Sequence, residues 1–277
     1  MRVGIFAKTF RRTSIEENLD AVRARGLDGV QYNMACAGLA SMPDAIDPAL
    51  CDRVRQAAAA RGIALVAVSG TFNLIHPDPD ERRAGFRRLR TLAAACRRLG
   101  TGIITLCTGT RDPEDMWRRH PDNDTPGAWR ELTTSMQEVL RIAADCEVTM
   151  AAEPELSNVM DTARKARRLL DDMQSPQLKI VMDAANLFHA GELGRMHDVM
   201  NEAFDLLGDA IVIAHAKDLT RDGAAGDAAA GTGVLDYAHY LALLRQADFD
   251  GPLVLHGLEE AQVPGCVAFL RTAMAGG

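Results

Sequence analysis

Residues 178–186 read LKIVMDAAN, and residues 210–218 read AIVIAHAKD. Both segments begin as apolar runs and reach a side chain that can bind a metal ion, as do VTMAAE at 148–153 and GPLVLH at 251–256. Short runs rich in Val, Ile and Leu predict buried strands. In a closed parallel barrel the carboxyl ends of the strands meet on one rim, where the active sites of this fold lie. The four runs therefore predict a barrel together with its active site.

The same reading extends over the rest of the chain. Apolar runs predict eight strands, at residues 2–7, 29–33, 64–69, 102–107, 148–153, 179–183, 210–216 and 252–257. Amphipathic helix patterns fill most of the gaps. Ser14, Asp47, Asp78 and Thr125 are expected N-caps, and the last three precede a proline, which favours the first helical turn. This alternation predicts a single (β/α)8 TIM barrel over residues 1–277, with an open doubly wound sheet as the alternative.

Composition excludes several classes of protein. A net charge of −7 argues against binding the phosphate backbone of nucleic acids, which needs a basic surface. No apolar run approaches the roughly 18–20 residues of a membrane helix. The sequence has no GxGxxG after the first strand and no GxxxxGK, so we expect no nucleotide cofactor. Its six cysteines form no CxxC motif, which favours reduced thiols and a cytoplasmic location.

The four side chains at the strand ends are Glu153, Asp183, His215 and His256. Two carboxylates and two imidazoles on one rim predict a site for a single divalent metal ion. Each residue also has a simpler interpretation. Glu153 or Asp183 could cap a following helix, and a lone histidine on a strand is often a satisfied core residue.

Four motifs carry a resemblance to a known family. They are DAANLFHAGEL at 183–193, HAKD at 215–218, GTGVLD at 231–236 and DFDGPLVLHGLEE at 248–260. With these motifs the chain resembles the xylose isomerase-like sugar phosphate isomerase/epimerase superfamily of TIM barrels, over nearly its whole length. The resemblance implies an enzyme that holds one Mn, Co, Zn or Mg ion with Glu, Asp, His and Glu from the last four strands.

By this match Glu153, Asp183 and His215 take the first three ligand positions. His256 stands where the family usually has the fourth, a glutamate. Epimerases of the family exchange protons with opposite faces of the substrate through two glutamates. Here the second proton-exchanging group would be His256, Glu259 or Glu155. A histidine in place of this glutamate favours isomerisation or dehydration, which need fewer bases than epimerisation. The nitrogen ligand that His256 would add favours Mn, Fe, Co or Zn over Mg.

The expected function is isomerisation or epimerisation of a small carbohydrate through an enediolate. The metal would act as a Lewis acid on a carbonyl, and Glu153 would remove the carbon-bound proton. Lys217 shares a strand face with His215 and could neutralise developing negative charge, or could simply pair with Asp183 or Glu153.

Further residues are candidate substrate contacts. Asn186 and His189 follow Asp183, where family members often carry a histidine, and His76 follows the third strand. The segment 108–124 is long for a connection from strand to helix. Trp117 within it could stack on a sugar ring, with Arg118, His120 and Asn123 also covering the rim. A surface position for His76, or a subunit contact for the long segment, is the alternative.

Two other functions compete. One is a metal-dependent dehydratase of a keto-polyol, similar to inosose dehydratase. The other is a barrel that binds a sugar acid without converting it. DNA repair enzymes of the endonuclease IV type share the fold but need more rim histidines and a basic groove. We therefore expect a small-molecule partner, no nucleic acid and no membrane, and leave homo-oligomer formation open.

Overall fold

The computed structural model describes residues 1–276, in which eight parallel strands form a closed barrel. Each strand pairs with its neighbours in chain order, and the pairs β6–β7 and β1–β9 complete the ring. The predicted (β/α)8 barrel is confirmed. Its strands are β1 (Arg2–Phe6), β2 (Gly29–Tyr32), β3 (Ala64–Ser69), β4 (Ile103–Cys107), β5 (Thr149–Glu153), β6 (Leu178–Asp183), β7 (Ile211–Asp218) and β9 (Pro252–Leu255). The short β8 (Ala228–Ala229) pairs antiparallel with the end of β7.

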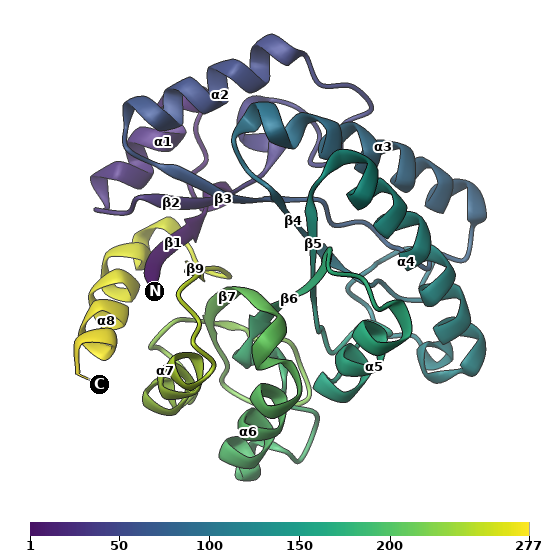
Figure 1. The fold of residues 1–277 in the computed structure, drawn as a ribbon. Coiled ribbons are helices and arrows are strands. Elements are labelled where there is room, and N and C mark those ends of the chain that lie inside the picture. The colour runs from purple at the N-terminus through teal and green to yellow at the C-terminus, as the bar shows by residue number, and fades with distance from the viewer. Residues whose placement is uncertain (277) are drawn as a thin grey trace.

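Eight helices surround the barrel, and α8 brings the C-terminal end of the chain back beside β1 (Figure 1). Among residues 1–276, none of the helices is long and apolar enough to cross a membrane. The helices are α1 (Ile15–Ala24), α2 (Pro48–Ala60), α3 (Pro79–Leu99), α4 (Pro126–Cys146), α5 (Ala163–Met173), α6 (Met196–Leu207), α7 (Tyr237–Gln246) and α8 (Val263–Ala275).

The predicted N-caps hold the starts of four helices. The side chains of Ser14, Asp47, Asp78 and Thr125 each accept a hydrogen bond from a backbone N–H of the first turn. These bonds satisfy donors that have no partner within the helix.

The barrel interior has an apolar floor beneath the rim. Five fully buried residues form it: Ala67, Ala151, Val181, Ile213 and Val254. Because side chains alternate along a strand, the residue two positions later on each strand faces the same interior. That rule places Ser69, Glu153, Asp183, His215 and His256 above the floor.

Strand register decides which of these side chains lie level with each other. The β6–β7 register shifts between Ile180 and Val181, and beyond the shift Asp183 pairs directly with His215. A shift of this kind re-aims side chains next to it. On the other side of β7, His215 pairs with Val254, so His256, the residue that follows β9, lies two residues beyond the partner of His215.

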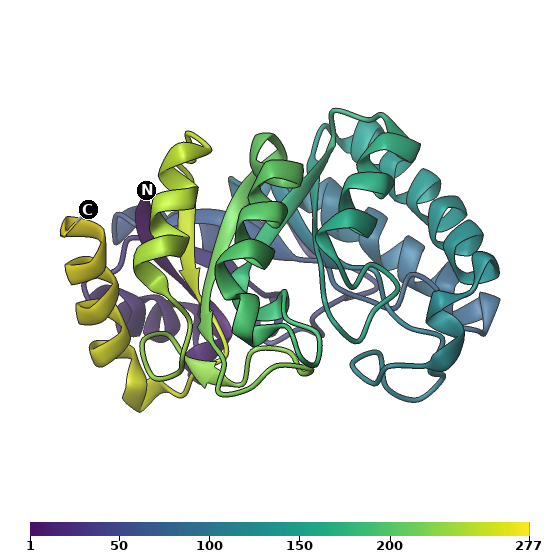
Figure 2. The same ribbon diagram turned by 90° about the horizontal axis from the view of Figure 1, so that it is seen from below.

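Two long connections lie at the carboxyl ends of the strands. Figure 2 shows the segment between β4 and α4 and the segment that follows β7 at the same end of the barrel. Both therefore border the rim where the candidate site residues lie.

Candidate active site

Three carboxylates and one ammonium group are buried together where β5, β6 and β7 end. The carboxylates belong to Glu153, Glu155 and Asp183, which are 8%, 5% and 1% exposed, and the ammonium belongs to Lys217, which is 6% exposed. Nζ of Lys217 lies 3.2 Å from Oδ2 of Asp183. A buried charge is costly unless it is compensated. When all four groups are ionised, this cluster has a net charge of −2.

His215 turns one ring nitrogen toward two of the carboxylates. Nδ1 lies 3.4 Å from Oε1 of Glu153 and 3.7 Å from Oδ2 of Asp183. Nδ1 of His215 and Oδ2 of Asp183 are buried and find no hydrogen-bond partner among residues 1–276. Ligand atoms of the three residues lie within 4.8 Å of one another. Unsatisfied nitrogen and oxygen atoms around one point suit a divalent cation, so these three residues fit the predicted metal ion.

Asp183 uses its two oxygens differently. Oδ1 accepts a hydrogen bond from the backbone N–H of Ala185 at 3.1 Å and caps the short 3₁₀ turn Ala184–Asn186. Oδ2 faces His215 and Lys217. The capping and ligand interpretations of this residue are therefore compatible, because each concerns a different oxygen.

Asn186 holds the two glutamates in place. Its amide nitrogen donates to Oε1 of Glu153 at 2.9 Å and to Oε2 of Glu155 at 3.0 Å. Its amide oxygen accepts from Nζ of Lys217 at 3.1 Å. Asn186 is fully buried, so it contacts the carboxylates rather than the open cavity.

The excess negative charge shifts the protonation of its neighbours. Burial lowers the pKa of His215, but the charges of Glu153 and Asp183 outweigh it and raise the pKa to about 9. Burial, followed by the charge of Glu153, raises the pKa of Glu155 to about 7. Burial also opposes the charged form of Lys217, yet Asp183 and the two glutamates hold its pKa above the ordinary value. The shifts of His215 and Lys217 reflect the excess negative charge of the neighbouring carboxylates.

His256 is not among the residues whose ligand atoms lie within 4.8 Å of one another, and its role as a fourth ligand remains a prediction. Its Nδ1 is also buried without a hydrogen-bond partner among residues 1–276. Its ring stacks on the face of the His215 ring, with centroids 5.0 Å apart and planes 4° from parallel. The β7–β9 register explains this, because His256 lies beyond the level of His215 and so covers that ring. Burial, together with the charges of His215 and Lys217, lowers the pKa of His256 well below its ordinary value.

Glu259 lies outside the lining of the cavity that contains Glu153, and its catalytic role remains a prediction. It is exposed, and its side chain takes part in a capping box with Gln262 at the start of the 3₁₀ turn Glu260–Gln262, which precedes α8. It lines a neighbouring cleft rather than the cavity that contains Glu153. Local capping explains this position, because a Glu three residues before Gln forms hydrogen bonds with the helix start.

Two predicted substrate-binding histidines lie outside the cavity lining. Nε2 of His76 lies 3.0 Å from the carbonyl oxygen of Pro113, so this ring supports the segment 108–124 from outside. Nε2 of His189 lies 3.0 Å from the carbonyl oxygen of Asp161, and the residue borders a small groove beside α5 and α6. Each ring contacts a backbone carbonyl of another segment.

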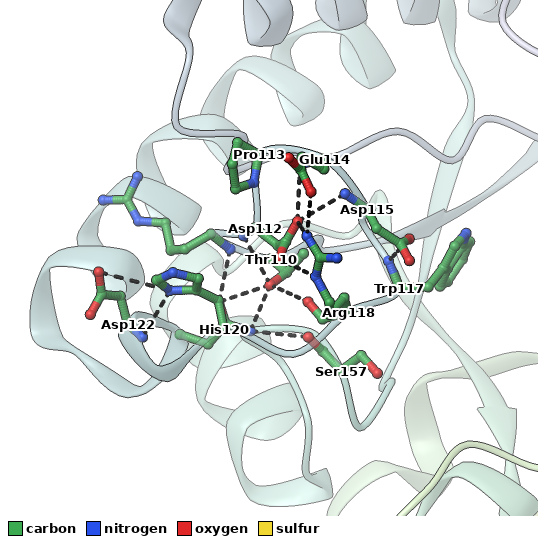
Figure 3. Close-up of polar contacts among 12 residues, drawn as sticks. Thr110, Asp112, Pro113, Glu114, Asp115, Trp117, Arg118, His120, Asp122 and Ser157 are labelled. Carbon is green, nitrogen blue, oxygen red and sulfur yellow. Dashed lines mark hydrogen bonds and ion pairs between the residues drawn. The ribbon is translucent and has the colours of Figure 1, made fainter.

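The segment 108–124 presents Trp117 to the cavity. Figure 3 shows the indole projecting away from the polar contacts that join the rest of the segment. Trp117 is 53% exposed and lines the cavity beside Met116. Arg118 instead pairs with Asp112 within the segment. His120 caps the 3₁₀ turn Pro121–Asp124, and buried Asn123 donates to the carbonyl oxygen of Ser157 at 3.0 Å.

The cavity has a volume of about 510 Å³ and opens above the carboxylate cluster. It is lined by Glu153, Glu155, His215 and Lys217 on one side, and by Phe6, Lys8 and His256 on another. The sequence interpretation missed Gln31, which lies in this lining and contacts His215. Its signal is a polar residue in the short apolar run GVQY, which is buried at every position.

Comparison with known proteins adds a family relationship. The family model described as xylose isomerase-like TIM barrel matches residues 19–271. L-ribulose-5-phosphate 3-epimerase UlaE of Shigella flexneri serotype 5b (strain 8401) is 25% identical over 184 residues, which cover 66% of this chain and 60% of that protein.

Solved structures share the fold over nearly the full chain. The apo form of 3-keto-D-glucoside 4-epimerase YcjR from E. coli has a TM-score of 0.74 at 18% identity and covers 98% of this chain and 99% of its own. The probable 3-DHS dehydratase AsbF from Bacillus anthracis has a TM-score of 0.76 at 14% identity, with the same coverage.

Proposed function

The chain belongs to the xylose isomerase-like TIM barrel family, and we propose that it is a divalent-metal-dependent isomerase or epimerase of a small sugar. The observation that carries this proposal is that Nδ1 of His215 and Oδ2 of Asp183 are buried without a hydrogen bond, in a cluster whose negative charge exceeds that of Lys217, the ion-pair partner of Oδ2. Buried polar atoms are nearly always satisfied, and a divalent cation bound here would satisfy both atoms and offset the negative charge.

Glu153, Asp183 and His215 would hold the ion. A divalent ion bound there supplies Lewis-acid polarisation of a substrate carbonyl. Lys217 is fixed by Asp183 and Asn186, and its charge would stabilise an oxyanion that develops on the substrate.

Proton transfer falls to the glutamates. Glu153 and Glu155 both line the cavity, and Asn186 fixes one oxygen of each. A carboxylate held within reach of a substrate C–H can remove the proton and return it to the adjacent carbon of the resulting enediolate. When the hydroxyl proton also passes to the former carbonyl oxygen, that sequence moves a carbonyl by one carbon, and it needs no second base acting on carbon.

The cavity wall at the ends of β1 and β9 has a different set of side chains. Phe6, Lys8 and His256 line it, and the carboxylates stand on the β5–β6 side. Epimerisation would need His256 to exchange a proton with the opposite face. Because the two walls carry different side chains, isomerisation and epimerisation would use different groups, and one experiment can distinguish their products.

The test is solvent-deuterium incorporation into ketopentoses, ketohexoses and their phosphates, each with added Mn²⁺ or Co²⁺. We expect deuterium at a carbon next to the carbonyl, and NMR of the product distinguishes a moved carbonyl from an inverted centre. Loss of water from the substrate would instead indicate a dehydratase. E153Q should abolish incorporation, and E259Q, which changes a helix-capping carboxylate outside the cluster, should retain it. A protein that binds these sugars but exchanges no proton with any metal would contradict the proposal.

A further inference from the structure

Gln31 contacts His215 from the side of the barrel opposite the carboxylates. Nε2 of His215 lies 2.9 Å from Oε1 of Gln31, and both residues are buried. An amide oxygen can only accept, so the proton of this contact belongs to Nε2 of His215. A neutral imidazole with its proton on Nε2 has its lone pair on Nδ1, the atom that faces Glu153 and Asp183.

Two hydroxyl groups orient the Gln31 amide. Its nitrogen lies 3.2 Å from Oγ of Ser69 and 3.1 Å from Oγ1 of Thr105. These contacts use both amide hydrogens and leave the oxygen for His215. The three residues come from β2, β3 and β4, which contribute no residue to the ligand cluster.

The His215 ring is also restrained elsewhere. His256 stacks on its face, and the hydroxyl of Tyr240 donates to the backbone oxygen of His215 at 3.1 Å. Neither contact distinguishes the two ring nitrogens. Gln31 is the group that does so, because it meets the ring edge at one nitrogen.

We propose that Gln31 is a positioning residue for the metal site, which fixes the tautomer of His215 so that Nδ1 presents its lone pair between Glu153 and Asp183. This inference rests on the proposed metal-binding function. Partners in this position orient a histidine ligand and increase its basicity, and their loss typically lowers metal affinity by 10–100-fold.

The test measures Zn²⁺ affinity by competition with a chromophoric chelator. Q31M keeps the length of the side chain and removes the acceptor, and we expect it to bind Zn²⁺ about 10–100-fold more weakly than wild type. Q31E restores an acceptor for Nε2, so its affinity should return to within a few-fold of wild type. S135A, which removes a buried hydroxyl bonded to the carbonyl oxygen of Leu74 away from the site, is the control for a general loss of packing.

A spectroscopic measurement tests the tautomer itself. In Zn²⁺-loaded protein with ¹⁵N-labelled histidine, the ring of His215 should show a proton on Nε2 and a metal-shifted Nδ1 in wild type. Wild-type affinity in folded Q31M, or coordination through Nε2, would overturn the inference while leaving the proposed function intact. Failure of wild type to bind Zn²⁺, Mn²⁺ or Co²⁺ would overturn both.

Discussion

The ammonium group of Lys217 partly compensates the negative charge of the buried carboxylates. It lies 3.2 Å from Oδ2 of Asp183 and donates to Asn186, which in turn donates to Glu153 and Glu155. One positive charge therefore reaches all three carboxylates, directly or through the amide. Removal of one partner from a buried ion pair leaves the other uncompensated, and such changes are strongly destabilising.

We predict that K217M lowers the unfolding free energy of the metal-free protein by about 3–5 kcal/mol. Urea unfolding in the presence of EDTA measures the change. K165M is the matched control, because Lys165 is partly exposed and Asp161, its partner, is also paired with Arg119. Arg119 still compensates the buried carboxylate of Asp161 when Lys165 is replaced, so K165M should change stability much less. Equal losses for the two variants would argue against a special role for Lys217.

The segment 108–124 combines a fixed base with a projecting side chain. Asn123 joins it to Ser157, and Asn158 donates to the carbonyl oxygen of Met116 at 3.2 Å. The bonds hold both ends of the turn that carries Trp117. An indole held on a supported turn beside a cavity can pack on a sugar ring without a large loss of conformational freedom.

We predict that W117A raises KM for the sugar substrate about 3–10-fold and leaves kcat nearly unchanged. That range matches the 0.5–1.5 kcal/mol of an aromatic contact, and a uniform loss of substrate binding raises KM alone. Steady-state kinetics measures both constants, with W117F expected to retain most of the affinity. If Trp117 is instead a subunit contact, W117A will change the sedimentation coefficient and leave KM as it was.

Sequence patterns predicted those elements whose signals are local. Strand ends follow from apolar runs, and the caps at Ser14, Asp47, Asp78 and Thr125 follow from short-range hydrogen bonds. The structure places His256 and Glu259 outside the group formed by Glu153, Asp183 and His215 for two different physical reasons, and their proposed roles remain predictions. The position of His256 relative to His215 depends on the register between β7 and β9. The side chain of Glu259 forms a capping hydrogen bond with a residue three positions later.

The contact between Gln31 and His215 could not be predicted from the sequence for another reason. It lies 184 residues from His215 in sequence, and only closure of the barrel brings the two together. A single polar residue within GVQY indicates that something polar must face it, but the pattern does not specify which residue does so. Partners of this kind require the three-dimensional arrangement.

The two halves of the barrel contribute different kinds of group to the site. β5, β6 and β7 contribute the ligand atoms. β2 contributes the Gln31 amide that contacts His215, and β3 and β4 contribute the hydroxyl groups that orient this amide. An ion bound to Glu153, Asp183 and His215 would therefore link three adjacent strands and remove the repulsion among their carboxylates. Both effects stabilise the folded protein alone, because the unfolded chain does not hold these residues together.

We predict that Mn²⁺, Co²⁺ or Zn²⁺ at about 100 times its Kd stabilises the protein by about 2.7 kcal/mol and raises Tm by roughly 5–10 °C. Differential scanning calorimetry with and without EDTA measures the shift. D183N retains an oxygen that can accept from Ala185 but loses the charge that faces His215 and Lys217, so its Tm should respond little to the same ions. Ions that bound at surface carboxylates would shift wild type and D183N equally. A wild-type Tm that none of the three ions changes would contradict the proposed metal site, and protons would then balance the buried charge.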